Sequence, residues 1–113
     1  MIELIDLTDW KKMRDIRLEL HREYGINISR DGREWRNAVK KWNELWSTGD
    51  VPYCITHSNK NGYKATTDFK EGMIAINDYI SRSRTMEKQA RDMRRGFERK
   101  NNCKYDFNKG EII

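Results

Sequence analysis

Five residues that can bond nucleic acid lie within a short stretch of the chain, away from the apolar stripe of a predicted helix. They are Arg33, Arg36, Asn37, Lys40 and Lys41. A guanidinium group can bond guanine at O6 and N7, and a carboxamide can bond adenine at N6 and N7. Lysine ammonium groups bond phosphate oxygens, which set the register of a protein on DNA. The stretch therefore predicts a DNA-contacting helix, with an ordinary solvated helix face as the alternative.

A second group of polar residues follows in a predicted hairpin. The members that could contact DNA are His57, Asn59, Lys60 and Lys64. Short polar donors and cations suit contacts with phosphates or with the minor groove. An ordinary hairpin loop is the alternative, and we expect these contacts only if the preceding helix also binds DNA.

No residues group into a catalytic motif. The sequence has no glycine-rich phosphate loop and no residue in a nucleophile motif, and its carboxylates are scattered. His57 lies near Cys54, but no further cysteine or histidine completes a metal-ligand set. We therefore expect a protein that is not an enzyme and that uses no cofactor, metal or small-molecule substrate.

The helix that must position the first group is predicted from Asp31 to Trp46, and residues 47–50 end it. Asp31 and Glu34 have the spacing of a capping box. The apolar positions recur at helical intervals. They are Trp35, Ala38, Val39, Trp42, Leu45 and Trp46. We expect its tryptophans and Trp10 to pack in the core rather than to stack on bases, and only Trp46 to be partly exposed.

The hairpin is predicted from alternating residues. Val51, Tyr53 and Ile55 form the first strand's apolar side, and Asn61-Gly62 supplies residues that tolerate positive φ before the return strand. An earlier helix is predicted over residues 9–24, with Thr8 as its N-cap and Gly25 as its stop.

One long helix is predicted over residues 69–100, either coiled-coil-like or bent near residues 81–83. A small domain cannot easily cover so long an apolar stripe, so we expect a homodimer. The candidate seam residues are Ile76, Ile80, Met86, Ala90 and Met93. The basic residues of the second half could instead follow phosphates. They are Arg82, Arg84, Lys88, Arg91, Arg94, Arg95, Arg99 and Lys100.

Length and charge agree with these expectations. The chain has 113 residues and a net charge of +5, which favours an anionic partner for a small protein. We divide it into residues 1–68 as a DNA-binding domain, 69–100 as the long helix and 101–113 as a loose tail. No apolar run could span a membrane, so we expect a protein without a membrane partner. Cys54 and Cys103 need not pair, so we expect a reducing intracellular compartment.

Three short strings carry a resemblance to a known family. They are Arg33-Glu34-Trp35-Arg36, Val51-Pro52-Tyr53-Cys54 and Gly62-Tyr63-Lys64-Ala65. This pattern resembles small winged-helix proteins of bacteriophages and prophages. The resemblance implies a mainly α protein with a β-hairpin wing (α+β), a winged helix-turn-helix followed by the long helix.

The same resemblance implies a function. The chain would bind double-stranded DNA in the cytoplasm of a bacterial host, in transcription regulation or replication initiation. The chain departs from the family pattern in having one clear helix, not two, before the DNA-contacting helix. The alternative function is a protein–protein interaction or oligomerisation module of a phage assembly or replisome, because the same fold also serves as a docking surface.

Overall fold

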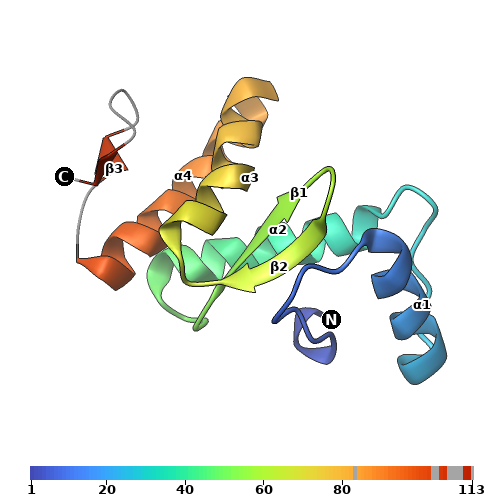
Figure 1. Cartoon of the computed structure of the whole chain (residues 1–113). Helices are drawn as coiled ribbons and strands as arrows, with labels where there is room; N and C mark the ends of the chain where they lie inside the picture. Colours follow the sequence, from blue (N-terminus) through green and yellow to red (C-terminus); the bar gives the residue numbers. More distant parts are fainter. Residues whose placement is uncertain (83, 103–104, 107–110, 113) are drawn as a thin grey trace.

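An antiparallel hairpin lies between helices on its two faces (Figure 1). The computed structural model describes residues 1–82, 84–102, 105–106 and 111–112. The elements in chain order are η1 (Ile2–Leu4), α1 (Met13–Tyr24), α2 (Arg33–Thr48), β1 (Cys54–Ser58), β2 (Gly62–Thr66), α3 (Phe69–Arg82), α4 (Arg84–Asn101), β3 (Tyr105–Asp106) and β4 (Glu111–Ile112). The expected α+β class is therefore confirmed.

Strand β1 is buried on both of its faces. Ile55 packs in one apolar cluster with α1, the first half of α2 and the N-terminal segment. Cys54 packs in a second cluster with α3, α4 and the end of α2. The burial of Cys54 raises the pKa of its thiol. The hairpin is thus part of the core as well as a surface ribbon.

The first helix begins later than predicted, because its expected first turn pairs with β2. Lys11 exchanges both backbone hydrogen bonds with Tyr63, at 2.9 and 2.8 Å, and Leu7 O accepts the N–H of Ala65. Thr8 bonds the side chain of Asp6 and caps no helix. Helix α1 therefore starts at Met13. Trp10 is only partly buried, with its ring 6.0 Å from Lys64 Nζ.

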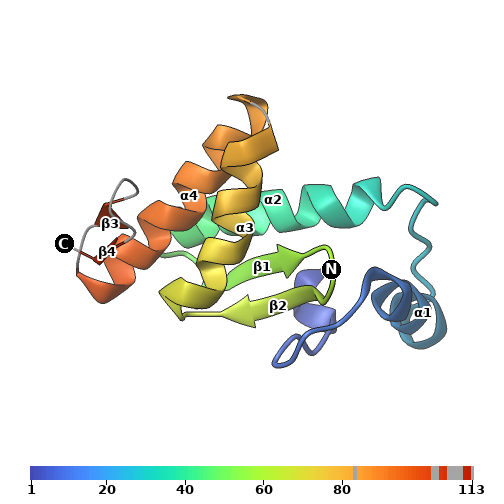
Figure 2. The ribbon, with the colours of Figure 1, turned by 45° about the horizontal axis from the view of Figure 1, so that its top comes forward.

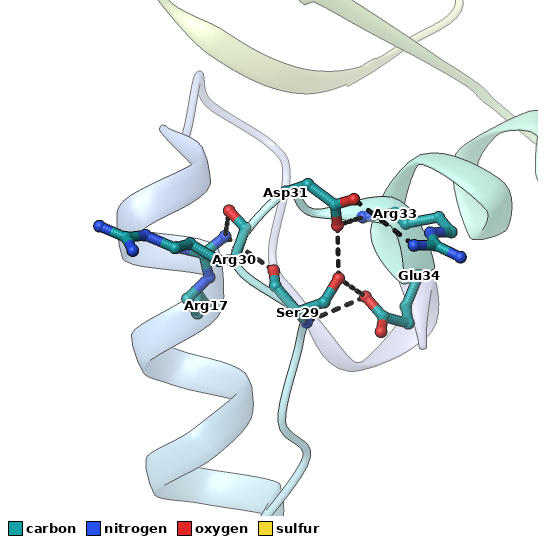
Figure 3. Close-up of polar contacts among 6 residues, drawn as sticks. All are labelled: Arg17, Ser29, Arg30, Asp31, Arg33 and Glu34. Carbon is teal, nitrogen blue, oxygen red and sulfur yellow. Dashed lines mark hydrogen bonds and ion pairs between the residues drawn. The ribbon is translucent and has the colours of Figure 1, made fainter.

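The start of α2 is fixed by a network that differs from the predicted capping box (Figure 3). The N-cap is Gly32, at φ +71°. Asp31 Oδ1 accepts the N–H of Arg33, while Glu34 Oε2 reaches back to the N–H of Ser29. The Ser29 hydroxyl lies 2.6 Å from both carboxylates and can donate to one at a time. These hydrogen bonds, from the Ser29 hydroxyl first, lower the pKa of both carboxyl groups.

The segment that leads into α2 also contacts α1. Arg17 Nη2 donates to the carbonyl oxygens of Ser29 and Arg30, at 3.1 and 3.0 Å (Figure 3). The segment between α1 and α2 is thereby held to α1.

Helix α2 ends at Thr48, as predicted. It is followed by Gly49 at φ +88°, a conformation that suits a glycine stop.

Buried side chains of α2 connect it to the rest of the core. Trp42 Nε1 donates to Tyr53 O at 2.8 Å. Asn43 accepts the N–H of Ile55 and donates to its carbonyl oxygen, at 2.9 and 3.0 Å. Trp35 is fully buried, as predicted, but the expected partial exposure of Trp46 is wrong. Trp46 is fully buried because α4 covers it, and its Nε1 donates to Met93 O at 3.2 Å.

The predicted long helix is two helices. Helices α3 and α4 lie side by side and run in opposite directions (Figure 2). Glycines allow close packing: a Cβ at Gly72 would lie 2.3 Å from Phe97, and one at Gly96 would lie 2.2 Å from Trp46. Folding back buries both apolar stripes inside one chain. Ser83, between the helices, lies outside the described residues.

This pairing changes the environment of the predicted dimer seam. Ile76, Ala90 and Met93 are buried within the chain, and Met86 packs partly buried against the same cluster. Among the five seam residues only Ile80 is exposed, at 46%. The premise of a long uncovered stripe is therefore wrong, since α2, α3 and α4 cover most of it together.

In the predicted tail, Tyr105 pairs with Ile112 and Asp106 with Glu111 in a short antiparallel ladder. Residues 103–104, 107–110 and 113 lie outside the described residues. Within the part of the chain that the structure describes, no helix is both long enough and apolar enough to cross a membrane.

Candidate nucleic-acid interface

The predicted DNA-contacting residues of α2 all lie on the surface. They are Arg33, Arg36, Asn37, Lys40 and Lys41. Arg33 lies 3.7 Å from Asp31 in an exposed ion pair. Among the described residues, the other three cations of this group have no carboxylate partner within ion-pair distance. Their charge is therefore available to an external anion.

Part of this helix face borders a cleft of about 410 Å³, which we call the basic cleft. Its lining residues come from α2, the hairpin, α3 and α4. They are Arg36, Asn37, Val39, Lys40, His57, Asn59, Tyr63, Tyr79, Met86 and Gln89. This lining contains two cations and three carboxamides but no carboxylate. The fold thus brings together five of the nine predicted DNA-binding residues, three from α2 and two from the hairpin.

Aromatic rings from the hairpin and α3 also line the basic cleft. The His57 ring lies 4.9 Å from the Tyr79 ring and 5.7 Å from the Tyr63 ring, between centroids. Tyr63 in turn makes an edge contact with Trp35 of α2, at 5.7 Å. Burial raises the pKa of Tyr63, and the nearby Arg36 charge opposes that rise. These contacts hold α2, the hairpin and α3 in a fixed relation.

His57 connects the hairpin to α3 as well as lining the basic cleft. Its Nε2 lies 3.3 Å from Asp78 Oδ2, and both side chains are largely shielded from solvent. The carboxylate belongs to α3 and does not line the cleft. His57 thus lines the cleft and contacts α3 at the same time.

The two hairpin lysines differ in their surroundings. Lys60 is exposed and lines a second hollow of about 320 Å³, together with Lys12 and Gly62. Lys64 is turned toward α3 and forms a short ion pair with Glu71. The hydrogen bond from Lys64 lowers the pKa of Glu71, and the same bond raises the pKa of Lys64. The structure gives Lys64 a partner inside the protein.

Sequence reasoning missed the contribution of α3 and α4 to the basic cleft. Met86 and Gln89 join it only because α4 folds back beside α2, while Tyr79 joins it from α3. A single long helix would have carried Met86 and Gln89 away from the hairpin. Lys12 was missed as a neighbour of Lys60, because residues 9–12 were assigned to a helix. No local signal marks any of these positions.

The chemistry of the basic cleft is that of an anion site. Cations and carboxamides can bond phosphate oxygens and base edges. Among the described residues, no three histidine, cysteine or acidic side chains are grouped so as to hold a metal ion. Comparisons with protein-family models, curated proteins and solved structures found no match.

Proposed function

We propose that this chain binds double-stranded DNA through α2 and the hairpin, as a phage- or prophage-encoded winged-helix protein. It would act in transcription regulation or replication initiation, in the cytoplasm of a bacterial host. One observation carries the proposal. The unpaired cations and the amide of α2 share a carboxylate-free cleft with His57 and Asn59 of the hairpin.

The proposal assigns different roles to the two elements. Arg36 and Asn37 lie in the first two turns of α2, the part of a recognition helix that usually reaches bases. Lys40 and Lys41 follow on the same helix and would bond phosphates. Asn59 and Lys60 lie at the hairpin turn, which would follow the neighbouring backbone. Lys64 is left out, because Glu71 already holds its ammonium group.

The proposal is tested by titrating labelled duplex at several salt concentrations. Binding releases counterions from phosphates, so affinity should fall steeply as salt rises. Absence of binding even at low salt would remove the proposal. Arg22→Ala, which removes an exposed cation of α1, is a control that should leave affinity nearly unchanged.

A preferred DNA sequence, selected from a random library, tests whether α2 or the hairpin reads the bases. Arg36→Ala should cost about 1–3 kcal/mol on the preferred sequence and much less on random DNA. Lys60→Ala should weaken binding to both duplexes equally and make the salt slope shallower by about one unit. The reverse pattern would make the hairpin the reader of sequence.

The second candidate is a protein-interaction module, favoured by two exposed isoleucines on α3. Ile74 and Ile80 are 44% and 46% exposed. In this function a second copy of the chain would cover them. Sedimentation equilibrium of the full chain tests it, with Ile80→Ser as the variant that should dissociate the dimer. A monomer throughout the micromolar range, with duplex binding intact, would exclude it.

A further inference from the structure

Helix α4 faces the basic cleft with uncharged residues. Met86 and Gln89 lie on the cleft side of the helix, across from Arg36 and Lys40 of α2. Gln89 is partly buried, and its carboxamide has no hydrogen-bond partner among the described residues. An amide that borders a cationic cleft without a protein partner is free to donate to a ligand oxygen.

Some cations of α4 have partners within the protein. Lys88 lies 2.9 Å from Asp92 and 3.5 Å from Glu44. Arg94 lies 3.1 Å from Glu98. Arg91 and Arg94 also line a separate hollow with Glu87 and the exposed Ile80. None of these charged residues of α4 lines the basic cleft.

The size of the basic cleft limits what it can take. Its volume of about 410 Å³ lies in the range of sites that hold one small ligand, roughly 300–1,000 Å³. A nucleotide unit of one strand is of that size, whereas a whole duplex is far wider than such a site. The backbone of one strand of a duplex can therefore enter, with its base edges toward Arg36 and Asn37 on the α2 side of the cleft.

We propose that the basic cleft binds the sugar-phosphate backbone of one strand of a DNA duplex, and that Gln89 of α4 donates its amide to a phosphate oxygen of that strand. This inference rests on the proposed function and adds a third contacting element to it. In this proposal, α4 contacts DNA through the neutral side that faces α2 and the hairpin. Its arginine-rich side makes no DNA contact.

The test adds one positive charge at two places on the same helix. Gln89→Lys puts the charge in the basic cleft, and Glu87→Gln adds the same net charge outside it. Each protein is titrated with one duplex over a range of salt. Circular dichroism melts establish that the variants are folded.

The proposal expects different salt slopes for the two variants. Gln89→Lys should neutralise one more phosphate, so the slope of log K against log salt should become steeper by about 0.9. Glu87→Gln should leave the slope unchanged. Gln89→Glu, which is nearly isosteric with the native residue, should weaken binding about tenfold, equivalent to about 1.4 kcal/mol.

Other results would overturn this inference. Equal slope changes for Gln89→Lys and Glu87→Gln would mean that only net charge matters. A steeper slope on single-stranded DNA but not on the duplex would assign the cleft to unpaired DNA. If the native protein binds no DNA at low salt, the proposed function fails first. If the native protein binds and all Gln89 variants match it, only the inference about α4 fails.

Discussion

Helices α2 and α4 are both basic and pack against each other, but their cations meet different neighbours. Lys40 of α2 borders a cleft without carboxylates. Lys88 of α4 lies between Asp92 and Glu44. Arg99 of α4 donates to Trp46 O at 3.2 Å, a carbonyl oxygen in the last turn of α2. The difference shows that a count of cations on a helix does not describe its surface. On α2, Arg36 and Lys40 share a cleft without carboxylates with polar residues of the hairpin, whereas Lys88 of α4 is paired within the protein.

We expect the largest effect from a substitution that disrupts the packing of α2 against α4. Trp46→Ala removes a fully buried ring that contacts Phe97 and hydrogen-bonds Met93 O. Truncation of a buried tryptophan costs about 3–5 kcal/mol of stability. Chemical denaturation measures it, and Trp10→Ala is the matched control because Trp10 is only partly buried. Equal losses for both variants would mean that Trp46 does not join α2 to α4.

A smaller change alters the same contact while keeping the ring. In a free helix, alanine is more stable than glycine by about 0.5–1 kcal/mol. At Gly96 the added Cβ would lie 2.2 Å from Trp46 Nε1, and such overpacking costs about 1–3 kcal/mol. Gly96→Ala should therefore destabilise the protein. A rise in melting temperature would contradict the close approach of α4 to α2.

Two lysine substitutions test whether the cations of α2 and those of α4 differ in their contribution to DNA binding. Lys40→Ala should make the salt slope of duplex binding shallower by about one unit, because one phosphate loses its counter-charge. Lys88→Ala should leave the slope unchanged, since that ammonium group already has carboxylate partners. Duplex titrations over a salt range measure both. A larger effect from Lys88 would move the DNA contact to the charged side of α4.

The smallest expected effect concerns pH and the hairpin's attachment to α3. Glu71 accepts hydrogen bonds from Lys64 and Thr66, which lower its pKa. The unfolded chain, with a glutamate pKa of about 4.3, binds more protons than the folded chain below that pH. Stability should therefore fall as pH drops from about 4.3 through the lowered value. Asp31 and Glu34 act with the same sign.

The measurement is a series of melts at decreasing pH. Glu71→Gln should make the acid-induced loss of stability shallower than in the native protein. Glu23→Gln, which changes an exposed glutamate of α1, should leave the loss unchanged. If the two variants behave alike, the Lys64–Glu71 pair contributes nothing specific to the hairpin's position.

The sequence was informative where local spacing determines the structure. The apolar stripe of α2 predicted the burial of Trp35 and Trp42, and Gly25 and Gly49 end helices as expected. The hairpin was also predicted, with Asn61-Gly62 at its turn, and Gly62 has φ +94°. The predicted alternation was wrong for the first strand, because β1 begins at Cys54 and is buried on both faces. The polar side of α2 was predicted to be exposed, and it is.

The sequence was uninformative where distant segments determine the structure. The periodicity of α3 continues into α4, and the alternative of a bend near residues 81–83 gave the position of the break. Nothing local predicted that the two helices would fold back against each other. Residues 9–12 have helical spacing, yet their backbone pairs with Tyr63, far along the chain. Gln89 has no distinguishing neighbours in sequence. Its position at the basic cleft depends on the packing of α4 against α2.

The hydrogen bonds of Asn43 have a consequence for association between copies of the chain. Ile55 pairs with Ala65 across the hairpin, and the backbone groups of both point outward. Leu7 O accepts the outward N–H of Ala65, and Asn43 occupies both outward groups of Ile55. A two-stranded sheet normally has two open edges that can template aggregation. Here a side-chain amide of α2 takes the place of a neighbouring strand at Ile55, so the backbone groups of that residue are not available to a strand of a second copy.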